Sequence, residues 1–162
     1  MFRKVAMSAL TAAILAAAFP AASQTLVKEV EVEADIEALQ NAPAAAHWTA
    51  ISDDLENAIV ARLVGMTADD GVKISVDIDT VELASSFQSA MGTAESKLKG
   101  RVNVTSDTDN TKFDTYDLTV GFEQAGPFFL PDTDLAAITT DSKEYYDAMI
   151  TAFADSVVQR LR

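Results

Sequence analysis

Carboxylates are the side chains whose spacing in this sequence could do chemistry. Asp77 and Asp79 lie two residues apart in an alternating segment, which puts both on one face of a strand. Two carboxylates on one face could act as acid and base in hydrolysis if a pocket raised the pKa of one of them. Lys99 and Arg101 occupy the same face of the next predicted strand, so we expect cross-strand ion pairs there instead.

Two short acidic runs are similar to the start of a calcium-binding loop. An EF-hand loop continues with a further oxygen ligand, a glycine and a glutamate at position 12. After the first run, this sequence has Thr111, Lys112 and Leu118 at those positions, and the second run is too short to specify a site. We therefore expect polar turns and predict no metal site, with four weak calcium candidates: Asp107, Asp109, Asp132 and Asp134.

The sequence offers few residues that could carry out nucleophilic catalysis. The sequence contains no cysteine, which excludes thiol catalysis and cysteine-ligated metals. Its single histidine, His47, lies beside Trp48 without a Gly-x-Ser-x-Gly motif, and one histidine cannot form a multi-histidine metal site. No glycine-rich phosphate loop is present. We predict no catalytic residue and no cofactor.

One segment between two prolines concentrates large apolar residues. Pro127 and Pro131 remove backbone donors and exclude an interior strand or helix. The segment either folds back over the edge of the core or presents an apolar contact to a partner. A second candidate lies in the loop predicted over 85–96. The predicted partner contacts are Phe128, Phe129, Leu130, Phe87 and Met91.

The first 23 residues have the pattern of a cleavable signal peptide. Arg3 and Lys4 precede an apolar run over 5–19, and Ala21 and Ser23 fit a cut before Gln24. The run is shorter than the roughly 20 apolar residues of a membrane span. We expect export by the general secretion route to the periplasm or medium, without a lipid anchor, because no cysteine can accept one.

Charge limits the partners of the remaining domain, residues 24–162. The signal peptide holds two of the 12 basic residues and none of the 25 acidic ones, so cleavage changes the net charge from −13 to −15. Such a charge disfavours nucleic acid and anionic lipid, which need a basic footprint. It favours a partner with a basic surface, and an apolar surface would suit the proline-flanked segment.

Hydrophobic periodicity predicts six elements in the order β-α-β-β-β-α. Strands are expected over 26–36, 72–83, 98–105 and 116–123, and the alternation slips at Thr80, which indicates a β-bulge. Helical stripes run over 42–64, where Asn41 could cap the start and Gly65 the end, and from a capping box at Asp141 to the C-terminus. Residues 124–140 are expected to form a loop.

These elements predict a single α+β domain, a two-layer sandwich. Three consecutive strands form an antiparallel meander, so the four-stranded sheet is mainly antiparallel, with two helices on one face and the signal-peptide helix before it. The basic strand with Lys99 and Arg101 should lie between two acidic strands, and the acidic first strand should lie at an edge. Either outer strand of the meander could be its neighbour.

The element order is similar to that of small envelope accessory proteins such as the lipopolysaccharide-assembly lipoproteins. Those proteins carry a lipidated cysteine after the signal peptide, and this sequence has none. Two functions remain open. We favour a non-enzymatic binding or accessory protein of the bacterial envelope, which presents loops or a sheet edge to a partner. The alternative is a small periplasmic hydrolase or lyase that uses acidic residues.

Overall fold

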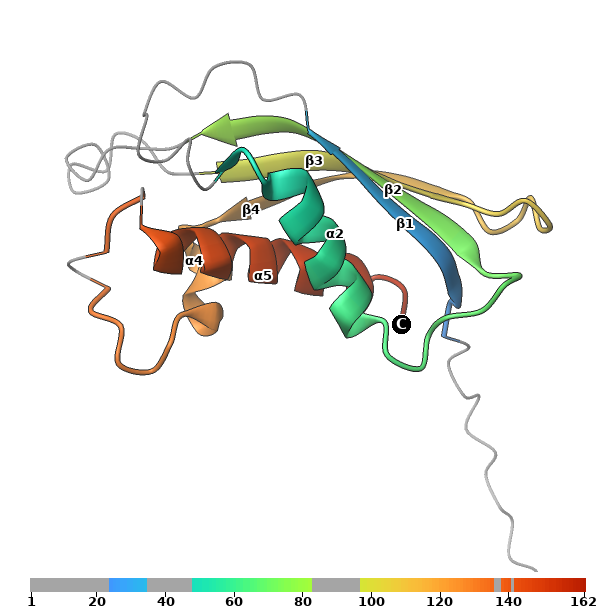
Figure 1. Ribbon diagram of the computed structural model, residues 1–162. Helices are drawn as coiled ribbons and strands as arrows, with labels where there is room; N and C mark the ends of the chain where they lie inside the picture. Colours follow the sequence, from blue (N-terminus) through green and yellow to red (C-terminus); the bar gives the residue numbers. More distant parts are fainter. Residues whose placement is uncertain (1–23, 35–47, 83–96, 136–137, 141) are drawn as a thin grey trace, which may run out of the picture.

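The computed structural model describes residues 24–34, 48–82, 97–135, 138–140 and 142–162. In Figure 1 the strands form one layer and the helices lie together against it, which confirms the predicted α+β sandwich. The described elements are β1 (Val27–Ala34), α2 (Ile51–Arg62), β2 (Val72–Glu82), β3 (Lys97–Thr105), β4 (Asp114–Gly121), α4 (Phe122–Ala125), the 3-10 helix η1 (Gly126–Phe128) and α5 (Lys143–Gln159).

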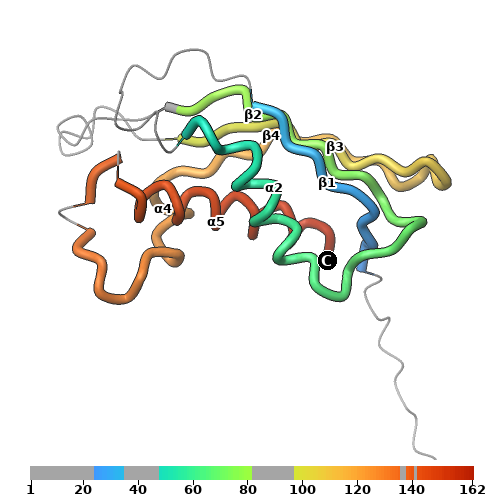
Figure 2. The backbone as a smooth tube through the Cα atoms, in the orientation of Figure 1, coloured from blue at the N-terminus to red at the C-terminus, as the bar shows by residue number. Residues whose placement is uncertain are grey.

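The strands follow the order β1-β2-β3-β4 in a single sheet. The β2–β3 and β3–β4 pairs are antiparallel, as the meander predicted, and β1 lies at an edge. Its neighbour is β2, and the two strands run parallel, with Val32 opposite Val76. Figure 2 shows the chain passing through α2 between them, a connection that returns the second strand in the same direction as the first.

The outer face of the sheet has the predicted arrangement of charge. Arg101 on β3 lies opposite Asp77 on β2 and Asp117 on β4. The predicted bulge is also present: Ile78 pairs with Gly100 and Thr80 with Lys99, so Asp79 is the extra residue. The basic strand β3 therefore lies between two acidic strands, which favours the order β2-β3-β4. On the other side of β2 the neighbour is the acidic strand β1, and there Glu33 lies opposite Asp77.

The alternation of the sequence predicts that Leu26 shares the apolar face with Val30 and Val32 and that Val27 lies on the acidic face. At the start of β1 this prediction is wrong. Val27 is 2% exposed and Leu26 is 42% exposed, the reverse of the predicted faces. The β1–β2 register shifts between Val27 and Glu29, so Lys28 is an extra residue that changes the phase. The amide of Val27 donates to the carbonyl of Met66 at 2.7 Å, which fixes this turn of the chain against the segment before β2.

The core lies between the sheet and the two long helices. Both predicted stripes are buried, with Ile51, Leu55 and Ile59 on α2 facing Met149 and Phe153 on α5 among others. Helix α2 packs against α5 and against β1. At the edge of this contact the Tyr146 hydroxyl donates to Asp54 Oδ2 at 2.7 Å, and the Tyr146 ring meets Trp48 edge to face. Burial raises the pKa of Tyr146, and the Asp54 contact adds to the effect.

Two boundaries differ from the sequence prediction. Phe122 begins the short helix α4 where a strand was expected to continue, and the predicted loop over 124–140 contains the rest of α4 and η1. The Gln124 side chain accepts from the Gly121 amide at 2.9 Å, which turns the chain out of the sheet. Helix α5 is capped by Ser142, one residue after the predicted cap, through a bond from the Tyr145 amide.

Candidate binding sites at the two ends of helix α5

The carboxylates considered for catalysis lie on the exposed outer face of the sheet. Asp77, Asp79 and Asp117 are all exposed. Asp117 Oδ1 accepts from Arg101 Nε at 3.1 Å, and Asp79 Oδ1 accepts from the Thr80 hydroxyl at 2.8 Å. An acid–base pair needs a pocket that raises the pKa of one of its carboxyl groups, and these three side chains lie on an open face. The sheet face therefore supplies no acid–base pair.

The four calcium candidates fall into two separate groups. Asp107 pairs with Lys28 at 2.8 Å, and that hydrogen bond and charge lower the pKa of Asp107. Asp109 accepts from the amide and hydroxyl of Thr111, and these bonds lower its pKa too. Asp109 thus bonds within the turn between β3 and β4, and Asp107 joins that turn to β1. Across the described ranges no three histidine, aspartate or glutamate side chains gather closely enough to hold a metal ion.

The proline-flanked segment is divided between core and solvent. Phe128 and Phe129 are half-buried and pack against the core, and Phe129 lies 5.6 Å from Phe122, centroid to centroid. Leu130, the next residue, is 72% exposed. The phenylalanines thus cover the edge of the core, and the leucine faces solvent. The contact with a partner stays a prediction.

Leu130 lines a shallow groove of about 620 Å³ beside the N-terminus of α5. Its apolar wall also contains Pro131 and Ile138. Three carboxylates surround that wall, and they come from two different segments of the chain. We call this site the acidic groove; the residues that define it are Leu130, Pro131, Asp132, Asp134, Ile138 and Glu144.

The remaining sequence candidates, Phe87, Met91 and His47, lie outside the described residues. The predicted signal segment and the Asn41 cap lie outside them as well. No helix in the ranges described here is long and apolar enough to cross a membrane.

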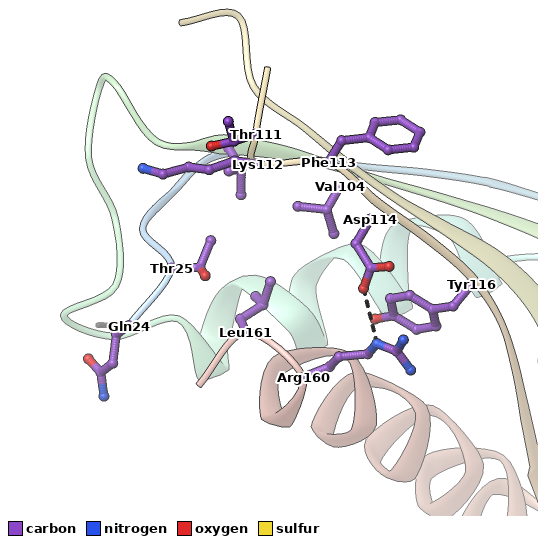
Figure 3. Close-up of a pocket in the computed structure, with 11 residues that line it drawn as sticks. Gln24, Thr25, Val104, Thr111, Lys112, Phe113, Asp114, Tyr116, Arg160 and Leu161 are labelled. Atoms are coloured by element: carbon purple, nitrogen blue, oxygen red, sulfur yellow. Dashed lines mark hydrogen bonds and ion pairs between the residues drawn. The ribbon is translucent and has the colours of Figure 1, made fainter. Parts of the chain in front are cut away.

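A second pocket, at the other end of α5, was not predicted. Its volume is about 270 Å³, and it forms where the start of β4 and the end of α5 diverge. Its floor is apolar, from the buried side chains of Val72, Val104 and Leu161. The Thr25 amide donates to the Leu161 carbonyl at 3.0 Å, which holds residues 24 and 25 at the rim. We call this site the β4 pocket (Figure 3).

An ion pair stacked on a tyrosine forms one wall of the β4 pocket. Arg160 Nε lies 3.1 Å from Asp114 Oδ2, and the guanidinium carbon lies 3.9 Å from the centre of the Tyr116 ring. Burial raises the pKa of Tyr116 to about 12, although the charge of Arg160 opposes the effect. The Tyr116 hydroxyl is buried and has no hydrogen-bond partner among the described residues.

The sequence offered little signal for this pocket. Lys112, Asp114 and Tyr116 are near one another in the chain, but Arg160 is 46 residues from Asp114.

The sequence matches no family model, and no curated protein is similar to it at a significant level. Among solved structures, a dodecameric variant of PelC from Paraburkholderia phytofirmans is 10% identical, with 85% of this chain and 86% of that one covered and a TM-score of 0.46. A Xanthomonas campestris protein of the DUF330 family is 14% identical over 88% and 85%, with a TM-score of 0.47.

A minor lipoprotein from Acinetobacter baumannii is 11% identical over 82% of this chain and 91% of that one, with a TM-score of 0.35. All three TM-scores are below 0.5. The likeness concerns the fold and carries no activity, ligand or assembly over to this protein.

Proposed function

We propose that this chain is exported, loses residues 1–23, and acts as a non-enzymatic binding module of the bacterial envelope. The single observation that carries the binding role is the acidic groove. A monomeric domain normally leaves single large apolar side chains scattered over its surface. Here Leu130 and Ile138 share a groove with three carboxylates. A contact of this kind suits a partner better than it suits solvent.

The groove favours one kind of occupant, a protein segment that carries an apolar side chain beside lysine or arginine. The apolar side chain would cover Leu130 and Ile138, and the basic residues would face Asp132, Asp134 and Glu144. Charge of this kind speeds association and selects against acidic partners. The net charge of the chain without residues 1–23, −15, extends the same attraction over a longer distance.

Leu130 is presented from a well-anchored segment. Phe128 and Phe129 pack against the core, and the rings of Phe129, Phe122 and Tyr145 lie within 6.3 Å of one another, centroid to centroid. A segment already held in place loses little conformational entropy when a partner binds, so more of the contact energy appears as affinity. No observation on Asp77, Asp79 or Asp117 favours the hydrolase alternative.

Export is tested separately from binding. The protein is expressed from its full sequence in a Gram-negative host, and the periplasmic fraction is analysed by intact mass spectrometry. We expect a mass that corresponds to a chain beginning at Gln24. A chain found in the cytoplasm with residues 1–23 intact would contradict export without bearing on the groove.

Binding is tested with a groove variant and a matched control. Leu130→Ser removes the exposed leucine of the groove. The control, Val64→Ser, replaces an apolar side chain that is 87% exposed and lies outside the groove. Tagged proteins are used to capture envelope partners, which are quantified by mass spectrometry. We expect Leu130→Ser to capture at least ten-fold less of a partner whose recovery Val64→Ser leaves unchanged. Equal recovery of every partner by both variants would contradict the proposal.

A further inference from the structure

The β4 pocket combines an apolar floor with an excess of positive charge among its lining residues. We propose that it binds a small amphipathic anion, a carboxylate that carries one ring-sized apolar group. The inference goes beyond the proposed function, because the pocket lies at the opposite end of α5 from the acidic groove and shares no residue with it.

The charge of the pocket determines the sign of the charge that a ligand must carry. Arg160 and Asp114 form an ion pair and largely cancel one another. Lys112, on the rim, forms no ion pair with a carboxylate of the described residues, although it lies close enough to Asp109 to lower the pKa of that carboxyl. The lining residues of the pocket therefore carry one net positive charge, which Asp109 partly offsets, in a protein whose net charge is −15 once residues 1–23 are removed. An anion would be attracted to this point and repelled by most of the remaining surface.

The floor determines what the anion carries. Val72, Val104 and Leu161 are each buried at 7% exposure or less, and their side chains line the pocket. Figure 3 shows Leu161 between Lys112 on one side of the pocket and Arg160 on the other. A volume of about 270 Å³ is smaller than a drug-sized site but exceeds the roughly 150 Å³ that holds one benzene ring. It accommodates one ring and a short acidic side chain.

The wall next to Arg160 is fixed before any ligand arrives. The guanidinium is held at Nε by Asp114 and on its face by the Tyr116 ring. A guanidinium has further donors at its terminal nitrogens, and within the described chain no residue accepts from them. The Tyr116 hydroxyl adds a buried polar atom without a partner, which a ligand or an ordered water would satisfy after a small movement of the wall.

The experiment is a titration of the ¹⁵N-labelled chain, purified as the cell delivers it, with sodium phenylacetate. Acetate lacks the ring and phenylacetamide lacks the charge, so these two controls separate the contribution of the ring to the affinity from that of the charge. We expect saturable amide shifts at residues 112–116 and 160–161, with a Kd in the millimolar range or tighter for so small a ligand. Acetate and phenylacetamide should each bind at least ten-fold more weakly.

Two substitutions complete the test. Lys112→Gln removes a positive charge from an exposed position of the pocket and should weaken the binding of phenylacetate at least five-fold. Lys97→Gln, at the far end of β3, should leave the binding unchanged. Leu161→Phe fills the floor and should abolish the shifts in a chain whose circular dichroism stays native. Shifts that do not saturate, or phenylacetate binding that is equal in wild type and Lys112→Gln, would overturn the proposal.

Discussion

Replacing Gly71 with alanine tests a close approach of two backbone segments, the residues before β2 and the start of β1. A β-carbon at Gly71 would lie 2.6 Å from the carbonyl carbon of Val27, 2.7 Å from the Leu26 oxygen and 2.7 Å from the Lys28 nitrogen. All three atoms belong to the backbone at the start of β1, so no side-chain rotation relieves the contact. Gly71 precedes Val72, whose amide donates to the Leu26 carbonyl at 2.8 Å. The substitution therefore forces β1 away from β2 where their parallel pairing begins.

The expected cost follows from two opposing terms. Overpacking of this kind costs about 3 kcal/mol or more when backbone must move. Alanine recovers up to about 1 kcal/mol by restricting the unfolded chain. We expect Gly71→Ala to lower the free energy of unfolding by about 2–3 kcal/mol, and the melting temperature by roughly 8 °C for a domain of this size.

The assay is urea unfolding followed by far-UV circular dichroism, with Gly126→Ala as the matched control. A β-carbon at Gly126 meets nothing within 4 Å, and the residue has helical backbone angles, so that variant should be unchanged or more stable by about 0.5 kcal/mol. If Gly71→Ala were as stable as Gly126→Ala, the close parallel contact of β1 with the start of β2 would be refuted.

Three further predictions concern the cap, the buried tyrosine and a surface pair. Ser142→Ala should cost about 1 kcal/mol in urea unfolding, because the Tyr145 amide loses its acceptor, and an unchanged midpoint would argue against this cap. Tyr116, with a pKa of about 12 against an ordinary value near 10, holds its proton more tightly in the folded state, so its contribution to stability is complete below pH 10 and is lost as the pH rises toward 12. The urea midpoint of Tyr116→Phe should accordingly fall less between pH 9 and pH 11.5 than that of the wild type; an equal fall would count against a raised pKa. In Lys28→Gln the pKa of Asp107 should rise toward its ordinary value, as read by carboxyl NMR, and no rise would mean that the pair does not persist in solution.

The periodicity of the chain was sufficient to predict the sandwich, because the apolar residues of each strand and helix have one core to face. Val76, Ile78, Leu98 and Val102 alternate along β2 and β3, and all four are fully buried. Charge was sufficient to place β3 between β2 and β4, since Arg101 finds an aspartate on both sides. Both inferences depend on residues that are neighbours in sequence or in an adjacent strand.

Features that depend on distant backbone contacts could not be predicted in this way. The phase of β1 is set by a bulge at Lys28 and by the bond from Val27 to Met66, and neither changes the local alternation of residue types. Phe122 continues the alternation of β4, but the Gly121–Gln124 bond ends the strand before it. The β4 pocket requires the end of α5 to meet the start of β4, a contact over 46 residues between Asp114 and Arg160.

Photo-crosslinking at position 130 in living cells would show whether the acidic groove contacts a partner. A benzophenone amino acid replaces Leu130 in one strain and Val64 in another, since both side chains face solvent and only Leu130 lies in the acidic groove. We expect position 130 to give a discrete crosslinked adduct with an envelope protein that carries a basic, apolar segment. Position 64 should give no adduct of that mass. The same adducts from both positions, or none from position 130, would contradict the claim that the acidic groove binds a partner.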